Sequence, residues 1–250
     1  MQDIYIGDEG KGFPLVLVHG FLGSSRMWES QIDFFKDYFR VITPDLPGYG
    51  KSNQVKSHNS IQSIANLLLN CLEEKKIDKF YLLGHSMGGM IVQEMAKKGG
   101  DKISKLVCYS TGPRGEMPGR FETVDQSREN LKKKGLEITA KNIAKTWFIK
   151  GEDAKYFDIC INAGKQTSME TADNSLVAIK NWNGVDTLKN IKNETLIVWG
   201  DQDKSYNLEQ IQTLENNIEN SKLIIFKNCA HNVHLEQPDQ FNKTIKDFLL

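Results

Sequence analysis

The sequence has no apolar run long enough to cross a bilayer, no net charge and no closely spaced cysteines. Its 250 residues include 32 basic and 32 acidic side chains, so its overall charge attracts neither nucleic acid nor an anionic membrane. The four cysteines form no C-x-x-C pair and no zinc-like spacing, a pattern typical of reduced thiols. No basic stretch followed by an apolar core opens the chain, so no signal peptide is expected. We therefore expect a cytoplasmic protein that binds neither nucleic acid nor membrane.

Short aliphatic runs alternate with helical patterns through much of the chain. The run Leu-Val-Leu-Val at residues 15–18 is typical of a fully buried strand. Other strands are expected at residues 4–6, 40–43, 79–83, 105–109, 195–199 and 223–226, with a turn at 7–12. Helices are expected at residues 25–38, 60–75, 90–98, 208–218 and 238–250. This alternation predicts an α/β fold with a mainly parallel, doubly wound sheet of about eight strands.

Residues 111–186 do not follow that alternation. They are polar and helical in pattern, with helices expected at residues 126–134, 139–149 and 174–182. The simplest interpretation is a helical cap, or lid, inserted between two strands. The core would then comprise residues 1–110 and 187–250.

The segment Gly84-His85-Ser86-Met87-Gly88 is a G-x-S-x-G motif with a strand pattern before it and a helical pattern after it. So sharp a turn predicts a strained, left-handed backbone at Ser86, with glycines where side chains would collide. It would also place the Ser86 hydroxyl clear of the backbone at a helix N-terminus, where the helix dipole favours developing negative charge. Ser86 is therefore the candidate nucleophile.

A serine hydroxyl is a weak nucleophile near neutral pH, so it needs a base and an acid that orients the base. Three of the five histidines have other expected places: inside the turn (His85), ending a strand (His19) and in a polar linker (His58). His231 and His234 follow the last expected strand, and either could be the base. The acid should follow the preceding strand, where Asp203 is preferred and Asp201 is expected to form the turn.

Several motifs together resemble the α/β-hydrolase fold superfamily over nearly the whole chain apart from the cap. The Gly84–Gly88 turn is one of them. The others are His19-Gly20-Phe21, Asp45-Leu46-Pro47-Gly48-Tyr49-Gly50-Lys51-Ser52, Gly200 with Asp203, and the segment from His231 to Pro238. They are similar to that superfamily's oxyanion loop, its D-x-P-G-x-G-x-S loop, its acid loop and its H-x-x-H-x-E-x-P segment, whose first histidine is catalytic.

The resemblance implies a serine hydrolase with the catalytic triad Ser86, Asp203 and His231. The oxyanion hole would be formed by the backbone N–H groups of Phe21 and Met87. The implied reaction, by way of an acyl-enzyme, is hydrolysis of a carboxylic ester or lactone of a small organic acid, as in a carboxylesterase, without cofactor or metal. C–C bond hydrolysis, a lyase step or perhydrolysis would use the same residues. A receptor that hydrolyses its ligand slowly is an alternative from another class.

Substrate-pocket residues are harder to assign. Aromatic side chains that either line the pocket or fill the core are Trp28, Phe121, Trp147, Phe148 and Trp182. Arg114 and Arg120 lie near the start of the expected cap. They could hold a substrate carboxylate, or they could be exposed loop residues. The partner is expected to be a small-molecule acyl compound.

Overall fold

A seven-stranded sheet forms the centre of the computed structural model, which describes residues 3–250. The strand order is β1-β3-β2-β4-β5-β6-β7. All neighbours pair in parallel except β1, which is antiparallel to β3. The strands are β1 (Ile6–Gly10), β2 (Pro14–Val18), β3 (Arg40–Pro44), β4 (Phe80–His85), β5 (Ile103–Tyr109), β6 (Glu194–Gly200) and β7 (Ser221–Phe226). The predicted fold class is confirmed, with seven strands where about eight were expected.

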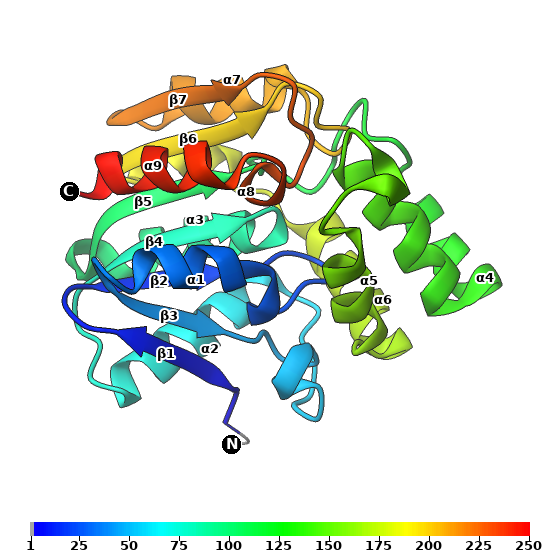
Figure 1. Cartoon of the computed structure of the whole chain (residues 1–250), viewed down its shortest axis with the longest axis horizontal. Coiled ribbons are helices and arrows are strands. Elements are labelled where there is room, and N and C mark those ends of the chain that lie inside the picture. The colour runs from blue at the N-terminus through cyan, green and yellow to red at the C-terminus, as the bar shows by residue number, and fades with distance from the viewer. Residues whose placement is uncertain (1–2) are drawn as a thin grey trace.

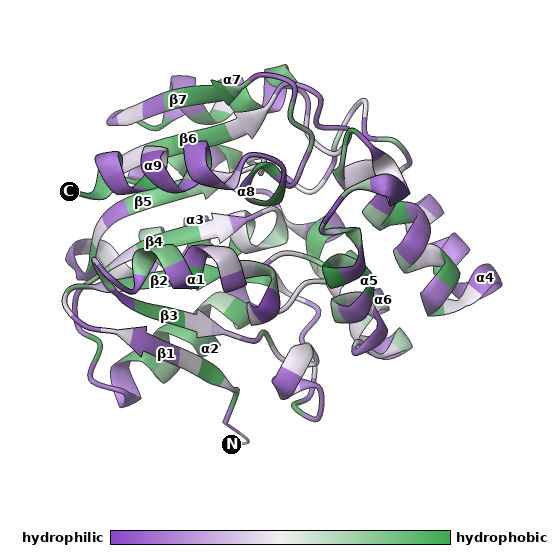
Figure 2. Cartoon of the chain, in the orientation of Figure 1, coloured by the Kyte–Doolittle hydropathy of each residue, from purple (hydrophilic) through white to green (hydrophobic). Residues whose placement is uncertain are grey.

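Each buried strand supplies side chains to both faces of the sheet. In β2, Leu15 and Leu17 join one apolar cluster, and Val16 and Val18 join the other, as the alternation of a strand requires. One face is covered by α1 (Glu29–Phe35) and α9 (Pro238–Leu249), and the other by α2 (Ile61–Glu74), α3 (Met87–Gly99) and α7 (Leu208–Asn217) (Figure 1). Figure 2 shows the strands as largely hydrophobic, with hydrophilic residues on the helices that cover them.

Strand β1 corrects the sequence-based prediction. Residues 7–12 were expected to form a turn after a strand at 4–6, but β1 extends through Gly10. It contains Gly, Asp and Glu, which have low strand propensity. Pairing with β3 stabilises it nevertheless, and the Arg40 guanidinium donates two hydrogen bonds to the Asp8 carboxylate at 2.9 and 2.6 Å.

Helix α1 is shorter than predicted. The segment expected to be one helix at residues 25–38 is a 3-10 helix (Ser25–Trp28) followed by α1. By contrast, α2 begins as predicted, directly after Ser60, whose hydroxyl accepts a hydrogen bond from the Ser63 N–H at 3.4 Å. A side-chain cap of this kind satisfies one of the backbone donors left free at a helix start.

Three helices are inserted between β5 and β6, beyond the carboxyl ends of the strands (Figure 1). They are α4 (Val124–Ala144), α5 (Phe157–Lys165) and α6 (Met169–Asn181). The helix predicted at 126–134 lies within α4, which breaks at Gly135 (φ 78°, ψ 171°). The one predicted at 139–149 overlaps only the end of α4, which a 3-10 helix (Lys145–Trp147) follows. Helix α5 was not predicted. Its sequence mixes apolar residues with Asp, Asn and Gly, and its packing against α4 decides its structure.

Two further properties concern the chain as a whole. No helix within residues 3–250 is both long and apolar enough to pass through a lipid bilayer. The cysteines are free thiols, and all except the half-buried Cys71 are buried (Cys108, Cys160 and Cys229).

Candidate active site

Ser86 occupies the turn between β4 and α3, with φ 56° and ψ −119°. Such a conformation costs a non-glycine residue about 1–3 kcal/mol, and the surroundings must hold it in place. A Cβ added at Gly84 would lie 2.3 Å from the Gly88 carbonyl oxygen, and one at Gly88 would lie 2.4 Å from the Val18 carbonyl oxygen. The expected strain and the need for both glycines are therefore confirmed. Ser86 itself is only half-buried.

His231 lies in the loop after β7 and contacts Asp203 from the loop after β6. Its Nδ1 is 2.9 Å from Asp203 Oδ2, and both side chains are buried, at 2% and 0% exposure. The other carboxylate oxygen of Asp203 accepts backbone hydrogen bonds from Ser205 at 2.7 Å and Tyr206 at 3.3 Å. An Nδ1–H that donates to the carboxylate leaves Nε2 of His231 as a proton acceptor.

Tyr206 is a site residue that the sequence analysis missed. Its ring stacks on the His231 ring, with centroids 5.9 Å apart and planes 17° apart. Burial raises the pKa of Tyr206, and the neighbouring Ser86 hydroxyl, the Arg120 guanidinium and the Thr111 hydroxyl oppose this effect only in part. The phenol is therefore protonated near neutral pH. The sequence signal that could have pointed to Tyr206 is its position three residues after Asp203 in the acid loop.

Tyr206 lies close to the Ser86 turn, because a Cβ at Gly112 would lie 3.0 Å from the Tyr206 ring and the hydroxyl of Thr111, the preceding residue, donates to the Ser86 carbonyl at 2.8 Å. Within residues 3–250 no hydrogen bond joins the Ser86 hydroxyl to the His231 ring. The ring of His85, the neighbour of Ser86 in sequence, lies 4.6 Å from that of His231. The structure thus brings the side chains of Ser86, Tyr206 and His231 into one group at the carboxyl edge of the sheet.

His234 lies on the other side of this group, so it does not compete with His231 for Asp203. Its Nδ1 is 2.8 Å from the Tyr109 hydroxyl, and its ring lies 4.7 Å from that of Trp28. Burial, followed by the charge of His231, lowers the pKa of His234 to about 3. His234 is therefore neutral at physiological pH.

His85 supports the His231 loop from beneath. Its Nε2–H donates to the His231 carbonyl at 3.2 Å. Burial, followed by the charges of His231 and His234, lowers the pKa of His85 well below its ordinary value. Two neutral histidines therefore pack around the one that contacts a carboxylate.

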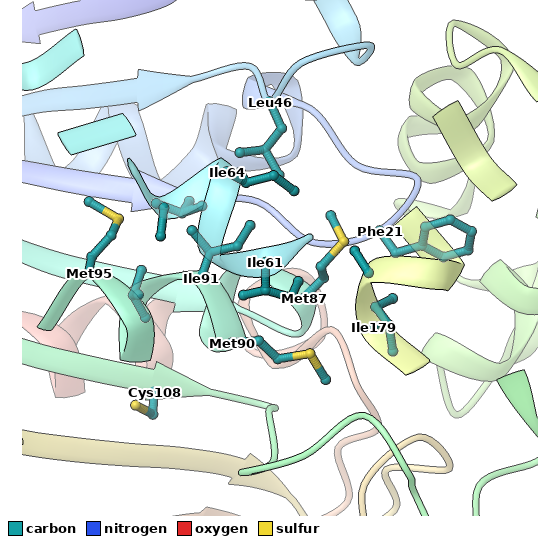
Figure 3. Packing of buried hydrophobic residues seen from close by; sticks show 14 of the residues in the cluster. Phe21, Leu46, Ile61, Ile64, Met87, Met90, Ile91, Met95, Cys108 and Ile179 are labelled. Carbon is teal, nitrogen blue, oxygen red and sulfur yellow. The ribbon is translucent and has the colours of Figure 1, made fainter. Parts of the chain in front are cut away.

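The loop that contains Phe21 is held in place by His19. The His19 Nδ1–H donates to the Gly20 carbonyl at 2.9 Å, while its Nε2 accepts from the Leu46 N–H at 3.0 Å. A Cβ at Gly20 would lie 2.9 Å from Cβ of Ser86, so the backbone of this loop passes directly beside the serine. Figure 3 shows Phe21 and Met87 in the same packed group as Ile179 of α6.

Asp45 supports the same region. Its Oδ1 accepts a hydrogen bond from the Ser25 N–H at 2.6 Å, and its Oδ2 accepts from the Lys51 N–H at 2.8 Å. This carboxylate thus joins the loop after β3 to the 3-10 helix before α1. The loop of Phe21 directly precedes that 3-10 helix in the chain.

The predicted pocket aromatics lie in different surroundings. Trp147 lies nearest the site, with its ring 6.2 Å from that of His231 and its carbonyl accepting the Asn232 N–H at 3.1 Å. Trp28 is buried against His85 and His234. The remaining three are Phe148, packed on Phe157; Trp182, whose indole donates to Glu94 at 2.8 Å; and Phe121, packed beneath Arg120.

The two arginines that could hold a substrate carboxylate, Arg114 and Arg120, lie in different surroundings. Arg120 is half-buried and lines a cavity of about 340 Å³, whereas Arg114 forms a backbone bridge with Asn183.

A second cavity, of about 530 Å³, lies between the inserted segment and the loop after His231, and is lined among others by Phe148, Tyr156 and Glu236. Glu236 binds backbone N–H groups through both carboxylate oxygens.

Comparisons with known proteins place this site in a family. Residues 14–238 match the family described as alpha/beta hydrolase fold. A pimeloyl-[acyl-carrier protein] methyl ester esterase of Legionella pneumophila is 28% identical over 99% of this chain and 100% of its own length. A 2-hydroxy-6-oxononadienedioate/2-hydroxy-6-oxononatrienedioate hydrolase of Pseudomonas putida is 29% identical over 99% and 92%. The solved esterase EaEST from Exiguobacterium antarcticum superposes with a TM-score of 0.91 at 25% identity, covering 98% of this chain and 94% of its own.

Proposed function

The chain belongs to the alpha/beta hydrolase fold family, and on that premise we propose that it hydrolyses a carboxylic ester or lactone of a small organic acid through Ser86, His231 and Asp203. The observation that carries the proposal is the buried 2.9 Å contact between His231 Nδ1 and Asp203 beside a serine held at positive φ. A relative that aligns with 99% of this chain and 100% of its own length is named as a methyl ester esterase.

In the proposed mechanism the Ser86 hydroxyl turns toward Nε2 of His231, which takes its proton as Oγ attacks the acyl carbon. Asp203 holds the Nδ1–H tautomer and stabilises the imidazolium that forms. The imidazolium then gives its proton to the leaving alcohol. Water, deprotonated by the same Nε2, attacks the acyl-enzyme, and Ser86 leaves with the proton returned from His231.

The negative charge on the carbonyl oxygen would be received by the backbone N–H groups of Phe21 and Met87. Met87 is the first residue of α3, where the helix leaves its N–H without an internal acceptor. The Phe21 N–H lies in the loop fixed by His19. Each such donor contributes about 3 kcal/mol to the stability of the transition state.

We also assign residues 111–186 to a lid over this site, with residues 1–110 and 187–250 as the core. The lid would exclude water and shape the acyl pocket, in which Trp147 lies nearest to His231. Trp28, Phe121, Phe148 and Trp182 would act through packing around that pocket.

The test is Ser86→Ala, assayed with p-nitrophenyl acetate. Hydrolysis should fall by about a thousandfold or more, and a fluorophosphonate probe should label the wild type but not the variant. Ser63→Ala, at a half-buried serine in α2, is the matched control and should retain full activity. If Ser86→Ala keeps most of the rate while folded, the proposed catalysis is wrong.

A second candidate reaction is hydrolysis of a C–C bond by the same residues. The relative from Pseudomonas putida, similar over 99% of this chain, is named as a hydrolase of a 2-hydroxy-6-oxo dienedioate. Comparing turnover of vinylogous diketones with that of simple esters separates the two reactions. An esterase would hydrolyse the esters and leave the diketones unchanged.

A further inference from the structure

Arg120 is a half-buried cation without an ion-pair partner in the described part of the chain. Its Nη1 donates to the Glu122 carbonyl at 2.5 Å and to the Ser127 hydroxyl at 3.0 Å. Within residues 3–250 its Nε and Nη2 donate to no acceptor, although a guanidinium has five N–H donors. Burial lowers the pKa of Arg120, an effect that the charges of Tyr206 and Glu122 oppose only in part.

Two other cations of the inserted segment, Lys180 and Arg128, are already paired. Lys180 lines the same cavity as Arg120, but its Nζ binds Asp125 at 2.6 Å, and Arg128 of α4 forms two hydrogen bonds with Asp173 at 2.7 and 3.1 Å. The Glu122 carboxylate is likewise occupied, because it accepts from Ser127 and Asn130. Arg120 therefore has donors to spare at a cavity wall, a combination suited to an anionic ligand.

The segment that contains Arg120 is fixed to the loop of Asp203 and Tyr206. The Phe121 N–H donates to the Lys204 carbonyl at 2.9 Å, and the Asn207 side chain donates to the Pro118 carbonyl at 2.9 Å. Tyr206 lies in the loop to which this segment is bonded. A Cβ at Gly112 would lie 3.0 Å from the Tyr206 ring, and the hydroxyl of Thr111, the preceding residue, donates to the Ser86 carbonyl at 2.8 Å. The loop of Tyr206 thus adjoins both the segment of Arg120 and the turn of Ser86.

We propose that Arg120 binds a second, anionic end of the acyl substrate, so that the preferred substrates are half-esters of dicarboxylic acids. This inference rests on the proposed ester hydrolysis at Ser86. The two oxygens of a carboxylate match the paired Nε–H and Nη2–H donors of a guanidinium. The cavity of about 340 Å³ gives the far carboxylate room, and Met117, Pro118 and Val124 give it an apolar wall. Because the lining of this cavity does not include Ser86, the length of the acid should decide whether one substrate reaches both.

The experiment compares monomethyl esters of the diacids from succinate to suberate with methyl esters of simple alkanoic acids of the same chain lengths. In the wild type, kcat/KM should favour the anionic ester at one length by about 10-fold or more, since hydrogen bonds to charged groups are the stronger ones. Arg120→Gln should remove that preference and leave the rate on the neutral ester within about threefold. Arg120→Lys should retain part of it.

Arg128→Gln is the matched control, because Arg128 is a paired arginine of the same inserted segment. It should not change the ratio of anionic to neutral rates. Retained activity on the neutral ester shows that Arg120→Gln is folded. Should that variant fail to fold, Arg120→Lys and the wild-type series still measure the preference.

Calorimetric titration of the free diacids into wild type, Ser86→Ala and Arg120→Gln gives a second readout that needs no turnover. Binding to the first two and not to Arg120→Gln supports the inference, even if the reaction proves not to be ester hydrolysis. Equal rates on anionic and neutral esters, or equal diacid binding with and without Arg120, would overturn it. If the wild type hydrolyses none of the esters, that result counts against the proposed function and not against anion binding at Arg120.

Discussion

In the sheet core, backbone lies directly against backbone at the catalytic turn, whereas the inserted helices α4, α5 and α6 meet the core through side chains. The turn at Ser86 leaves no room for a Cβ at Gly84 or Gly88. The inserted helices instead use pairs such as the Tyr49 hydroxyl with Ser175 Oγ at 2.7 Å. Side-chain contacts can change one at a time without moving the backbone. The serine turn is therefore fixed by backbone contacts, whereas single substitutions can change the contacts of the inserted helices.

A pair of glycine substitutions tests this difference most strongly. Gly88→Ala would put a Cβ 2.4 Å from the Val18 carbonyl oxygen and 2.6 Å from that of His19. Neither atom can rotate away, so we expect a loss of about 3 kcal/mol or more of folding free energy. Hydrolysis should fall with it, because α3 and the loop of Phe21 would separate. Urea unfolding and the p-nitrophenyl acetate assay measure the two effects.

Gly164→Ala in α5 is the counterpart in the inserted segment. Its nearest neighbours would be Ala140 Cβ at 3.3 Å and Leu22 Cβ at 3.9 Å, both side-chain atoms. Alanine gains about 1 kcal/mol of helix propensity over glycine, which offsets a mild contact. We expect stability within about 1 kcal/mol of the wild type. A loss as large as that at Gly88 would mean that both regions are packed equally tightly.

The elements that were predictable from the sequence are those whose structure is decided locally. The buried strands were recognisable as aliphatic runs, and the serine turn was recognisable from its glycines, which the steric contacts at Gly84 and Gly88 require. Strand β1 could not be recognised, because Gly7, Asp8 and Glu9 favour a turn and only pairing with β3 makes them a strand. Helix α5 was missed because packing against α4, not its own pattern, defines it.

The candidate site divides in the same way. Ser86, Asp203 and His231 follow from motifs and strand order, and the contact between the last two is present in the structure. Tyr206 could not be inferred, because its stacking on His231 depends on how one loop folds against another. The free donors of Arg120 depend on which neighbouring carboxylates are already paired, and that is decided in three dimensions.

Acid should weaken the core through its buried histidines. Burial lowers the pKa of His234 to about 3, and that of His85 also lies well below its ordinary value of 6.5. Below pH 6.5 the unfolded chain binds protons that the folded protein excludes, so stability falls as pH falls toward the folded pKa. Each histidine contributes a slope of about 1.4 kcal/mol per pH unit in that window.

Replacing His234 separates the effect of histidine protonation on stability from the effect of carboxylate protonation. In His234→Asn the amide can still form a hydrogen bond with the Tyr109 hydroxyl, and one titrating group is gone. The wild type should lose stability faster than the variant between pH 6 and pH 4, as measured by urea unfolding. Parallel curves for the two proteins would show that His234 is protonated in the folded state.

Glu236 joins the two regions, and its substitution should have a smaller effect than Gly88→Ala. Its Oε1 accepts the Ile149 N–H of the inserted segment at 2.8 Å, and its Oε2 accepts the Ala230 N–H, next to His231, at 2.6 Å. In Glu236→Gln one acceptor becomes an NH₂ that faces a backbone donor. We expect a loss of about 1–3 kcal/mol of folding free energy and a severalfold drop in kcat, because the His231 loop loses a support. Glu219→Gln, at an exposed pair with Lys192, is the control and should change stability by less than about 0.5 kcal/mol. If Glu236→Gln behaves like that control, packing and not this carboxylate holds the inserted segment to the core. The two regions would then differ less in how they are held together.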